Sequence, residues 1–368
     1  MVKTRGKTLV TFGEIMGRIE PEGLMRFSQG MPGHLSISFS GAEANVAVSN
    51  QMMGRPARFI SALPSNGLGE ACLDSVRRYG VDTSFVRIGE GRLGLYFVET
   101  GANQRPSSVI YDREHSVIAE TPGDSYDWEG GFREAEWFHI SGITPAVSEF
   151  AAEASLQAVK AAQAAGLTVS CDLNYRKKLW KWNSEFTHRE LAEKTMRAIL
   201  PYVDIVVGNE EDAWDILRIK AGDTDVNSGR LNIERYPHVA AQIIKQFPNV
   251  KKVAITLRES ISASHNNWGA MLYDGETKIP FFAPLAGEKY TPYKIKNIVD
   301  RVGGGDAFSA GLIFALTDDE LSGNLQDALA YGVAASCLCH SIQGDFNYSS
   351  RDEVLSLMKG NGSGRVKR

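Results

Sequence analysis

The sequence predicts an α/β domain in which a mostly parallel central sheet is covered by helices on both faces and carries a small additional β-sheet. Short β-rich runs alternate with segments of helical periodicity along most of the chain. Residues 17–39 and 92–120 break this alternation, because they carry strand-like runs without helices between them. The domain is expected to cover residues 8–355 with these two stretches inserted, and residues 356–368 to form the C-terminal end and a flexible tail.

The predicted strands of the main sheet are short and rich in β-branched and aromatic residues. They are Thr8–Phe12, Arg58–Ala62, Trp137–Ile140, Thr168–Cys171, Ile205–Val207 and Lys252–Thr256. Helical patterns lie between them at residues 44–53, 68–79, 150–165, 189–200, 239–247 and 324–340. The pattern over residues 150–165 is the clearest, because Gly166 follows it where a helix commonly ends.

The two irregular stretches are interpreted as one small sheet. Their strand-like runs are Leu35–Phe39, Gly94–Val98 and Ser107–Tyr111. Such a sheet would serve as a lid that excludes water from an active site. The other interpretation is a solvated layer that makes dimer contacts, and both can hold together. Residues 218–237 are interpreted as a polar surface insertion.

Composition excludes several classes of function. A chain of 368 residues with 43% hydrophobic content can bury a substantial core, and a net charge of −4 gives no electrostatic reason to expect a nucleic-acid or membrane partner. No apolar run approaches the roughly 18–20 residues of a membrane span. The four cysteines, Cys72, Cys171, Cys337 and Cys339, lack zinc-binding spacing. They predict buried free thiols and a cytoplasmic location.

The most informative stretch is Val299–Phe308, where three glycines run into Asp306 and an apolar helix pattern begins. Backbone amides of Gly303, Gly304 and Gly305 at a helix start can cradle an anion. A carboxylate beside that cradle can accept a proton from a substrate hydroxyl. Phosphoryl transfer to an alcohol requires both groups. Taken alone, however, an acidic residue in the first turn is also ordinary compensation of the helix dipole.

Other routes to nucleotide binding are missing from the sequence. There is no Gly-x-x-x-x-Gly-Lys-Ser/Thr loop, and the glycine-rich and His-Arg-Asp motifs of protein kinases do not occur. The first strand leads into residues 13–17, which do not match a dinucleotide-binding fingerprint.

A second glycine-rich turn, Gly41–Asn45, leads into the helix expected at residues 44–53. Together with the first element it resembles the two signatures of the ribokinase-like (pfkB) carbohydrate kinase family. Gly41 and Asn45 match its Gly-x-x-x-Asn sugar-contact turn. Residues 300–306 read Asp-Arg-Val-Gly-Gly-Gly-Asp where the family usually has Asp-Thr-x-Gly-Ala-Gly-Asp. The order of elements is similar from about residue 8 to residue 355.

The resemblance implies a three-layer α/β/α sandwich with a β-sheet lid. It also implies that Asp306 is the general base and that the amides of Gly303, Gly304 and Gly305 form the anion hole for the γ-phosphoryl group of ATP. Nucleotide contacts are implied at Asn174, Asn209 and Thr256, as well as at Gly303 and Gly305.

The segment Asn209–Asp212 is similar to the family's Asn-x-x-Glu element, which helps to organise Mg²⁺. Asp212 stands in place of the Glu, so it would act through water; the other interpretation is the start of a solvated helix. Arg258 stands where the family usually has Gly after Thr-Leu. A K⁺ site beside the anion hole is common in the family, and the sequence leaves open whether this chain has one.

Several runs are similar to those of 2-keto-3-deoxygluconate kinases, namely residues 93–97, 111–113, 172–180 and 340–347. A sugar-acid acceptor requires cationic groups for its carboxylate, and arginine is the usual one. The candidates are Arg113 and Arg176, with Arg18 as a third, and Arg176 could instead contact ATP phosphates.

Other acceptor contacts are expected from the lid and from the C-terminal part of the chain. Tyr96 and Tyr111 would contact acceptor hydroxyls from the lid. Asp345 would bind an acceptor hydroxyl or hold the C-terminal loop. His115, His139 and His340 show no metal-binding spacing and are interpreted as structural.

The expected reaction is ATP-dependent phosphorylation of 2-keto-3-deoxygluconate at its C6 hydroxyl, which gives 2-keto-3-deoxy-6-phosphogluconate. The alternatives are a kinase for fructose, ribose or a nucleoside, and a non-catalytic sugar- or nucleotide-binding regulator on the same fold. Acceptors derived from gluconate and galactonate are not distinguished. Exposed edges of the lid sheet predict a homo-oligomer built through the lid.

Overall fold

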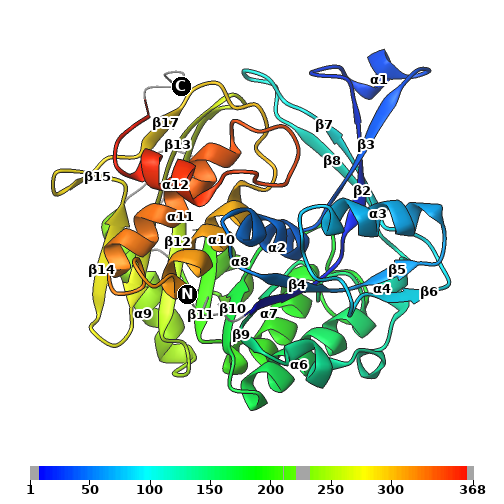
Figure 1. Cartoon of the computed structure of the whole chain (residues 1–368), viewed down its shortest axis with the longest axis horizontal. Helices are drawn as coiled ribbons and strands as arrows, with labels where there is room; N and C mark the ends of the chain where they lie inside the picture. Colours follow the sequence, from blue (N-terminus) through cyan, green and yellow to red (C-terminus); the bar gives the residue numbers. More distant parts are fainter. Residues whose placement is uncertain (1–7, 210, 221–232, 363–368) are drawn as a thin grey trace, which may run out of the picture.

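A computed structural model of the chain describes residues 8–209, 211–220 and 233–362. In this part of the chain a central sheet of nine strands runs through the molecule (Figure 1). Its mutually parallel strands are, in spatial order, β12 (Lys252–Ser262), β11 (Ile205–Asn209), β10 (Thr168–Asp172), β9 (Ala135–Ser141), β1 (Thr8–Phe12) and β4 (Ala57–Ile60). The predicted parallel sheet is therefore confirmed.

One edge of this sheet is antiparallel, which the sequence analysis did not predict. Strand β13 (His265–Asp274) runs antiparallel to β12 and also pairs with β14 (Ile279–Ala283) and β17 (Tyr293–Ile295). Strand β12 continues to Ser262, well past its predicted end at Thr256. Its outer half, residues 258–262, is exposed or half-buried and lacks the apolar run that marks a buried strand.

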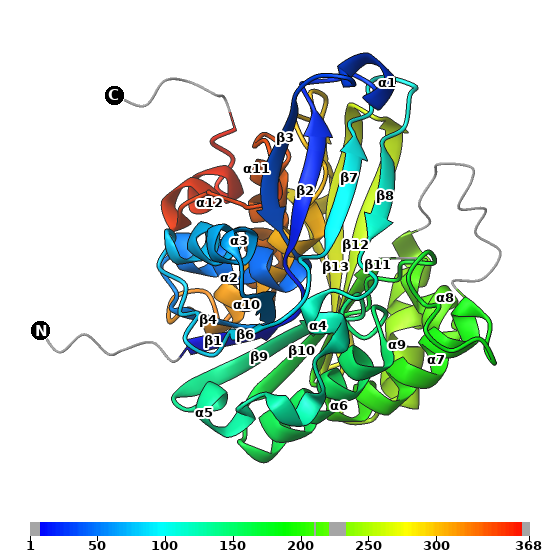
Figure 2. The ribbon, with the colours of Figure 1, turned by 90° about the vertical axis from the view of Figure 1, so that its right-hand side faces the viewer.

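Helices cover both faces of the central sheet, as Figure 2 shows. One face carries α2 (Ala42–Met52), α10 (Gly304–Thr317), α11 (Leu325–Cys339) and α12 (Arg351–Met358). The other carries α5 (Trp128–Phe132), α6 (Glu149–Ala164), α7 (His188–Ile199), α8 (Asp212–Leu217) and α9 (Tyr236–Gln246). Adjacent residues Leu9 and Val10 of β1 point into these two different cores, as alternation along a strand requires. The domain is thus a three-layer α/β/α sandwich.

Smaller elements complete the fold. Helix α3 (Gly67–Arg77) packs against α2 in a further apolar cluster. The other short elements are β5 (Ala62–Pro64), which pairs with β6 (Arg87–Gly89), β15 (Leu285–Ala286), which pairs with β16 (Lys289–Tyr290), and α4 (Val117–Glu120).

The two irregular stretches form one separate sheet, called the small sheet below. It contains, in spatial order, β3 (Leu35–Ser40), β2 (Met16–Pro21), β7 (Leu95–Glu99) and β8 (Ser108–Asp112), and helix α1 (Phe27–Gly30) lies at its tip. Strand β2 is parallel to β7, and the other two pairs are antiparallel. Figure 2 shows the small sheet standing beside β12 and β13.

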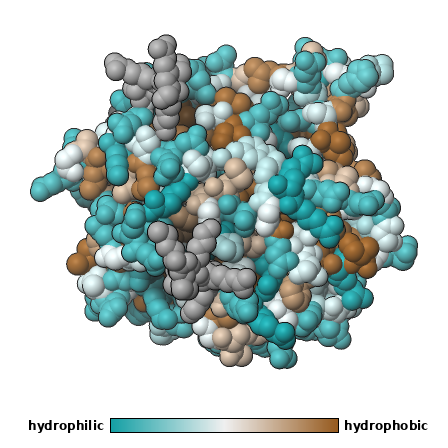
Figure 3. All heavy atoms as spheres, viewed as in Figure 1, coloured by the Kyte–Doolittle hydropathy of each residue, from teal (hydrophilic) through white to brown (hydrophobic). Residues whose placement is uncertain are grey.

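Strand register gives the small sheet two different faces. One face carries a cross-strand row that consists of Ser38, Arg18, Tyr96 and Tyr111. The other face carries an apolar row that consists of Ile37, Ile19, Phe97 and Ile110. Ile37 and Ile110 are 50% and 56% exposed. In Figure 3 hydrophobic spheres also gather at the upper right, where Figure 1 has the small sheet.

Most predicted helices occur within a few residues of their expected bounds. The domain boundary expected after residue 355 falls inside α12, which continues to Met358. Of the predicted insertion at residues 218–237, residues 221–232 lie outside the described part, as do residues 363–368 of the predicted tail. None of the helices in the described ranges combines the length and the apolar character needed to span a membrane.

Candidate active site

A cavity of about 360 Å³ lies where the small sheet meets the carboxyl ends of the parallel strands and the start of α10. Open parallel sheets commonly bind ligands at this edge. The sequence-predicted residues that line it are Gly41, Asn45, Tyr96, Tyr111, Asn174, Arg176, Asn209, Asp212, Thr256, Gly303, Gly304, Gly305, Asp306 and Asp345. Two other candidates from the sequence analysis, Arg113 and Arg18, do not line it.

The two signature elements meet in this cavity. Asn45, in the first turn of α2, donates its Nδ2 to Oδ2 of Asp306 in the first turn of α10 at 2.6 Å. The Oδ1 of Asn45 accepts the amide of Gly41 at 3.3 Å. Asn45 therefore fixes the Asp306 carboxylate relative to the turn at the start of α2.

The environment of Asp306 makes it a better base near neutral pH. Burial raises the pKa of Asp306 to about 6, and the negative charge of Asp345 acts in the same direction. The hydrogen bond from Asn45 and the positive charge of Arg176 oppose this rise. The carboxylate is thus mostly ionised at pH 7 while its proton affinity is well above that of a free aspartate.

The glycines before Asp306 place unpaired amides at the cavity wall. Gly303 caps α10 with φ of 81°, a left-handed conformation that favours glycine. The first amides of a helix have no carbonyl partner within the helix, and they carry its partial positive charge. A side chain on Gly305 would meet no protein atom within 4 Å, so the space over this residue is open. The start of α10 can therefore receive an anion.

Asp212 links the ends of two neighbouring strands. Its Oδ1 accepts the amide of Tyr175 at 3.0 Å, and its Oδ2 accepts the amide of Asn209 at 3.0 Å. The residue is 3% exposed, and burial raises its pKa. Asp212 does begin helix α8, as the alternative interpretation expected, but its side chain is buried and not solvated. Glu210 lies outside the described residues.

Asp172, the last residue of β10, is a site residue that the sequence analysis missed. Burial raises the pKa of Asp172 well above its ordinary value, and the nearby charges of Asp212 and Asp306 raise it further. Its Oδ1 accepts the amide of Asn174, which has φ of 40°. The sequence could have identified Asp172 by its position, because Asp172 directly follows the apolar run of a central strand.

The carboxylates suit a divalent cation that keeps several of its own waters. Within the described ranges, no group of three His, Cys, Asp or Glu side chains could hold a metal ion. Mg²⁺ usually keeps several waters and is bound by one or two carboxylates together with substrate phosphates. Asp172 and Asp212 supply two mutually repelling carboxylates at one wall of the cavity, which fits that mode of binding.

Three arginines line the cavity: Arg176, Arg258 and Arg301. The charge of Arg176 lowers the pKa values of Asp172, Asp212 and Asp306, so its guanidinium lies near all three carboxylates. Burial lowers the pKa of Arg301, and the charge of Arg258 lowers it further, which places these two guanidiniums close together. Sequence analysis gave Arg301 no role, although it stands in the glycine motif itself.

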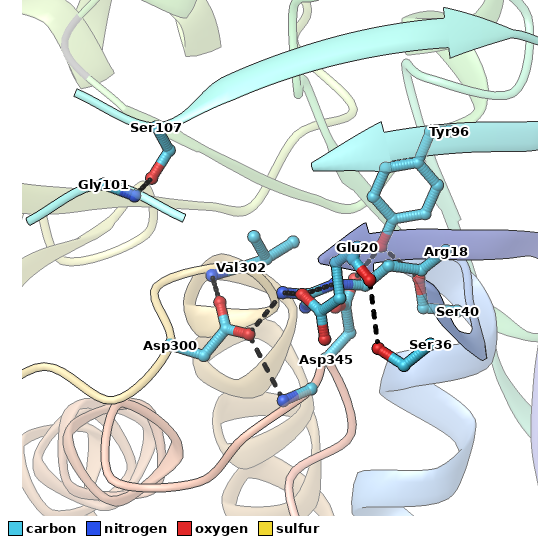
Figure 4. A network of polar contacts seen from close by, with 11 residues as sticks. Arg18, Glu20, Ser36, Ser40, Tyr96, Gly101, Ser107, Asp300, Val302 and Asp345 are labelled. Carbon is cyan, nitrogen blue, oxygen red and sulfur yellow. Dashed lines mark hydrogen bonds and ion pairs between the residues drawn. The ribbon is translucent and has the colours of Figure 1, made fainter. Parts of the chain in front are cut away.

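Two other predicted cations are bound elsewhere. Arg113 donates its Nε to Glu14 at 2.5 Å in a buried ion pair, and it lines a neighbouring cavity of about 370 Å³ that shares Tyr111 with the first. The Nη1 of Arg113 has no hydrogen-bond partner in the described part of the chain. Arg18 is enclosed by carboxylates and does not line the cavity (Figure 4).

The hydroxyl of Tyr96 connects the small sheet to the C-terminal loop. It donates to Oδ2 of Asp345 at 2.8 Å and lies 2.6 Å from the hydroxyl of Ser40 (Figure 4). The ring of Tyr111 lies 6.5 Å from that of Tyr96. His340 also lines the cavity, although the sequence analysis gave it a structural role, and its Nδ1 bonds to the Ser336 carbonyl at 2.7 Å.

The remaining predicted nucleotide contacts lie on adjacent strands. The Oδ1 of Asn209 accepts the amides of Glu211 and Asp212 at 2.8 and 3.1 Å and so shapes the turn into α8. The hydroxyl of Thr256 in β12 lies 3.5 Å from the Gly208 carbonyl. Of the other histidines, His139 is buried, which lowers its pKa to about 3, and His115 pairs with Glu120 at the surface.

Known proteins resemble this chain in sequence and in fold. Residues 7–347 match the pfkB family of carbohydrate kinases. The 2-dehydro-3-deoxygalactonokinase of Haloferax volcanii is 30% identical over 97% of this chain and 98% of its own. The solved 2-dehydro-3-deoxygluconokinase of Thermotoga maritima is 40% identical over 96% of this chain and all of its own, with a TM-score of 0.85. A fructokinase of Xylella fastidiosa, solved with bound ATP, is 20% identical over 97% of this chain and all of its own, and its TM-score of 0.73 shows the same fold. The chain therefore belongs to the pfkB family of carbohydrate kinases.

Proposed function

We propose that this kinase transfers the γ-phosphoryl group of ATP to the C6 hydroxyl of 2-keto-3-deoxygluconate, forming 2-keto-3-deoxy-6-phosphogluconate. The observation that carries the proposal is the Asp306 carboxylate, held by Asn45 at the glycine-rich start of α10, in one cavity with the guanidinium of Arg176. The names of the relatives from Haloferax volcanii and Thermotoga maritima support a sugar-acid acceptor.

Asp306 is the proposed general base. Its carboxylate accepts the proton of the C6 hydroxyl as the oxygen attacks the γ-phosphorus in line and the bond to the ADP oxygen breaks. The raised pKa of Asp306, about 6, favours this proton transfer at neutral pH. Asn45 orients the carboxylate by its hydrogen bond of 2.6 Å.

The start of α10 is the proposed anion hole. Amides of Gly303, Gly304 and Gly305 would donate to the γ-phosphoryl oxygens as charge develops on them. Arg258 and Arg301 add positive charge next to this position, where they would face the phosphates of ATP. Asn174, Asn209 and Thr256 would complete the nucleotide contacts. Mg²⁺, which neutralises phosphate charge when bound, would be held through water by Asp172 and Asp212.

The acceptor would lie between the small sheet and α2. Gly41 and Asn45 would contact its hydroxyls near C6, and Tyr96, Tyr111 and Asp345 would contact those farther along. Arg176 would bind its carboxylate. The Nη1 of Arg113 has no hydrogen-bond partner among the described residues, and it would contribute to acceptor binding from the adjoining cavity that Arg113 lines together with Tyr111. The small sheet would act as the lid that keeps water from competing with the acceptor.

The apolar row on the outer face of the small sheet supports a homo-oligomer built through this sheet. Ile37 and Ile110 are 50% and 56% exposed, and a second copy of the chain would cover them. The four cysteines are free thiols, which supports a cytoplasmic location. A K⁺ requirement would be found by comparing rates in K⁺ with rates in a bulky organic cation.

An acceptor panel with MgATP tests the proposal. The panel contains 2-keto-3-deoxygluconate, 2-keto-3-deoxygalactonate, fructose, ribose and a nucleoside, and kcat/KM is measured for each. The proposal expects 2-keto-3-deoxygluconate to have the highest kcat/KM. A higher value for 2-keto-3-deoxygalactonate would keep the sugar-acid class but refute the configuration of the proposed acceptor. A neutral sugar or nucleoside with the highest kcat/KM would refute the assignment of the acceptor.

A further inference from the structure

We propose that Arg18 is a positioning residue that couples the seating of the small sheet to the geometry of the anion hole. The proposal rests on the proposed function and deepens it, because it assigns a task in phosphoryl transfer to a side chain that touches neither substrate. It starts from a buried ion cluster that joins segments far apart in the sequence (Figure 4).

Arg18 lies on β2 of the small sheet, and its side chain is 1% exposed. Its Nη2 bonds to Asp300 at 2.6 Å and to Glu20 at 2.7 Å, while its Nη1 bonds to Asp345. Glu20 belongs to the same strand, but Asp300 and Asp345 belong to the main domain. One guanidinium therefore fastens the small sheet to two carboxylates outside it.

Both of these residues contact the segment that forms the anion hole, Asp300 through its carboxylate and Asp345 through its backbone. Asp300 accepts the amide of Val302 at 3.0 Å through Oδ1 and that of Gly344 at 3.3 Å through Oδ2. The backbone of Asp345 packs so closely against Gly303 that a side chain at position 303 would collide with its carbonyl. The ion cluster thus sets the turn that leads into α10.

The charges of the cluster explain why the coupling is strong. Three carboxylates surround one guanidinium, so loss of the arginine leaves buried negative charges without a counter-charge. Breaking one partner out of a buried ion pair is far more costly than breaking a surface pair. Burial already raises the pKa of Asp300, and the charge of Asp345 raises it further. The small sheet cannot leave this position without exposing or protonating these acids.

Arg301, the residue after Asp300, is linked through the turn between β12 and β13 to the loop between β7 and β8 of the small sheet. Arg301 donates to the carbonyls of Ser262 and Ala263 at 3.2 and 2.8 Å, in the turn between β12 and β13. The amide of Ala263 donates in turn to the Asn103 carbonyl at 2.7 Å, in the loop between β7 and β8. Of these two consecutive residues, Asp300 thus contacts the small sheet directly, and Arg301 reaches its β7–β8 loop through Ala263.

The test compares Arg18→Met with Arg92→Met in the full chain. Arg92 is the matched control, because it forms a two-point ion pair with Asp112 of β8 at 2.7 and 2.6 Å and does not reach Asp300 or Asp345 through any described contact. Two readouts are measured. The first readout is steady-state kinetics, which gives kcat, KM for each substrate and the ratio of ADP formed to sugar phosphorylated. The second is hydrogen exchange of residues 298–306 and 340–347.

For Arg18→Met we expect kcat to fall on the order of 100-fold with KM for MgATP within about threefold of wild type. We also expect more ADP per phosphorylated sugar and faster exchange in both segments. Arg92→Met should match wild type in all of these. Arg18→Lys, which keeps a charge but not the planar fork, should recover part of kcat. It also serves as the test variant if Arg18→Met does not fold.

Equal effects of the two variants, or an unchanged product ratio and unchanged exchange in Arg18→Met, would overturn the proposal. Hydrogen exchange needs no substrate, so it decides the role of Arg18 even if wild type phosphorylates none of the acceptors. A wild-type protein that phosphorylates none of the acceptors would refute the proposed function, and hydrogen exchange would still test the coupling.

Discussion

The side chains of Asn45 and Asp306 meet at 2.6 Å although 261 residues separate them in the sequence. Each lies in the first turn of a helix, α2 or α10, and both helices pack on the same face of the central sheet. The contact brings an amide donor to a carboxylate whose pKa burial has raised to about 6. Its hydrogen bond and the charge of Arg176 keep that carboxylate ionised at neutral pH, which a proton acceptor requires.

The acid limb of the pH profile should report Asp306. Because the base must be ionised and its pKa is raised to about 6, kcat/KM is expected to fall as the pH drops through about 6. Asn45→Ala removes the bond that lowers this pKa, so its limb should move to higher pH. Asp306→Asn should lose on the order of 10²–10⁴-fold in kcat while it keeps nucleotide affinity and thermal stability. An unchanged limb in Asn45→Ala would contradict the assignment.

The amide cradle can be blocked without disturbing the protein. Gly305→Val adds a side chain whose Cβ meets no atom of a neighbouring element within 4 Å, so we expect a normal melting temperature but a loss of kcat on the order of 10²–10³-fold. Gly323→Val is the matched control, since that position is equally open and does not line the cavity. If both variants turn over like wild type, the γ-phosphoryl group does not lie over Gly305.

Arg176 and Arg258 should each bind a different substrate, Arg176 the sugar acid and Arg258 MgATP. Arg176→Met is expected to raise KM for the sugar acid on the order of 10- to 100-fold, because a charged hydrogen bond is lost, and to leave KM for MgATP unchanged. Arg258→Met should do the reverse. Steady-state kinetics with each substrate varied in turn would show the division. A larger change for MgATP in Arg176→Met would move that arginine to the nucleotide.

Glu43 should make the fold less stable as the pH rises. Burial raises its pKa from 4.5 to about 7, so the native state holds this proton more tightly than the unfolded chain. That stability is full below pH 4.5 and is lost as the pH rises through about 7, by roughly 3 kcal/mol in total. The proton would lie on Oε2, which has no partner in the described residues, while Oε1 accepts three hydrogen bonds.

Denaturant unfolding at several pH values checks this expectation. Glu43→Gln mimics the protonated acid, so the difference in unfolding free energy between the variant and wild type should grow in favour of the variant above about pH 5. A constant difference over this range would show that Glu43 titrates normally.

The outer apolar row of the small sheet should govern association. Ile37→Asp together with Ile110→Asp is expected to convert an oligomer into a species of 40.3 kDa in sedimentation, because two charges would enter the buried contact. Ile279→Asp, at an equally exposed position on β14, should leave the mass unchanged. A wild-type chain that sediments at 40.3 kDa would refute the proposed homo-oligomer.

The sequence predicted the parts of the fold in which an apolar run marks a strand or a glycine marks the end of a helix. Strand β1 was predicted at its observed bounds, and α6 within one residue of them. Strands β13, β14 and β17 were missed because they form an antiparallel edge joined by short turns, which does not follow the alternation of strands and helices. The outer half of β12 was missed because its side chains are largely exposed.

The candidate site was predictable where a motif fixed several residues at once, as at Gly41–Asn45 and residues 303–306. Charged partners were less predictable, because pairing depends on contacts between distant segments. Arg113 pairs with Glu14 across 99 residues, and Arg18 pairs with Asp345 across 327. No local pattern distinguishes such an arginine from one that faces a ligand. Asp172 could have been recognised from its place at the end of a central strand.

The two rows of the small sheet carry different constraints on sequence change. Because side chains alternate between faces, inserting one residue into β2 or β7 would turn Arg18 or Tyr96 outward and bring an apolar neighbour in. Insertions in the tip around α1 would shift neither row. Divergence in length among descendants of this enzyme should therefore accumulate at the tip, while new acceptor preferences arise by single replacements at cavity positions such as Tyr96 and Tyr111.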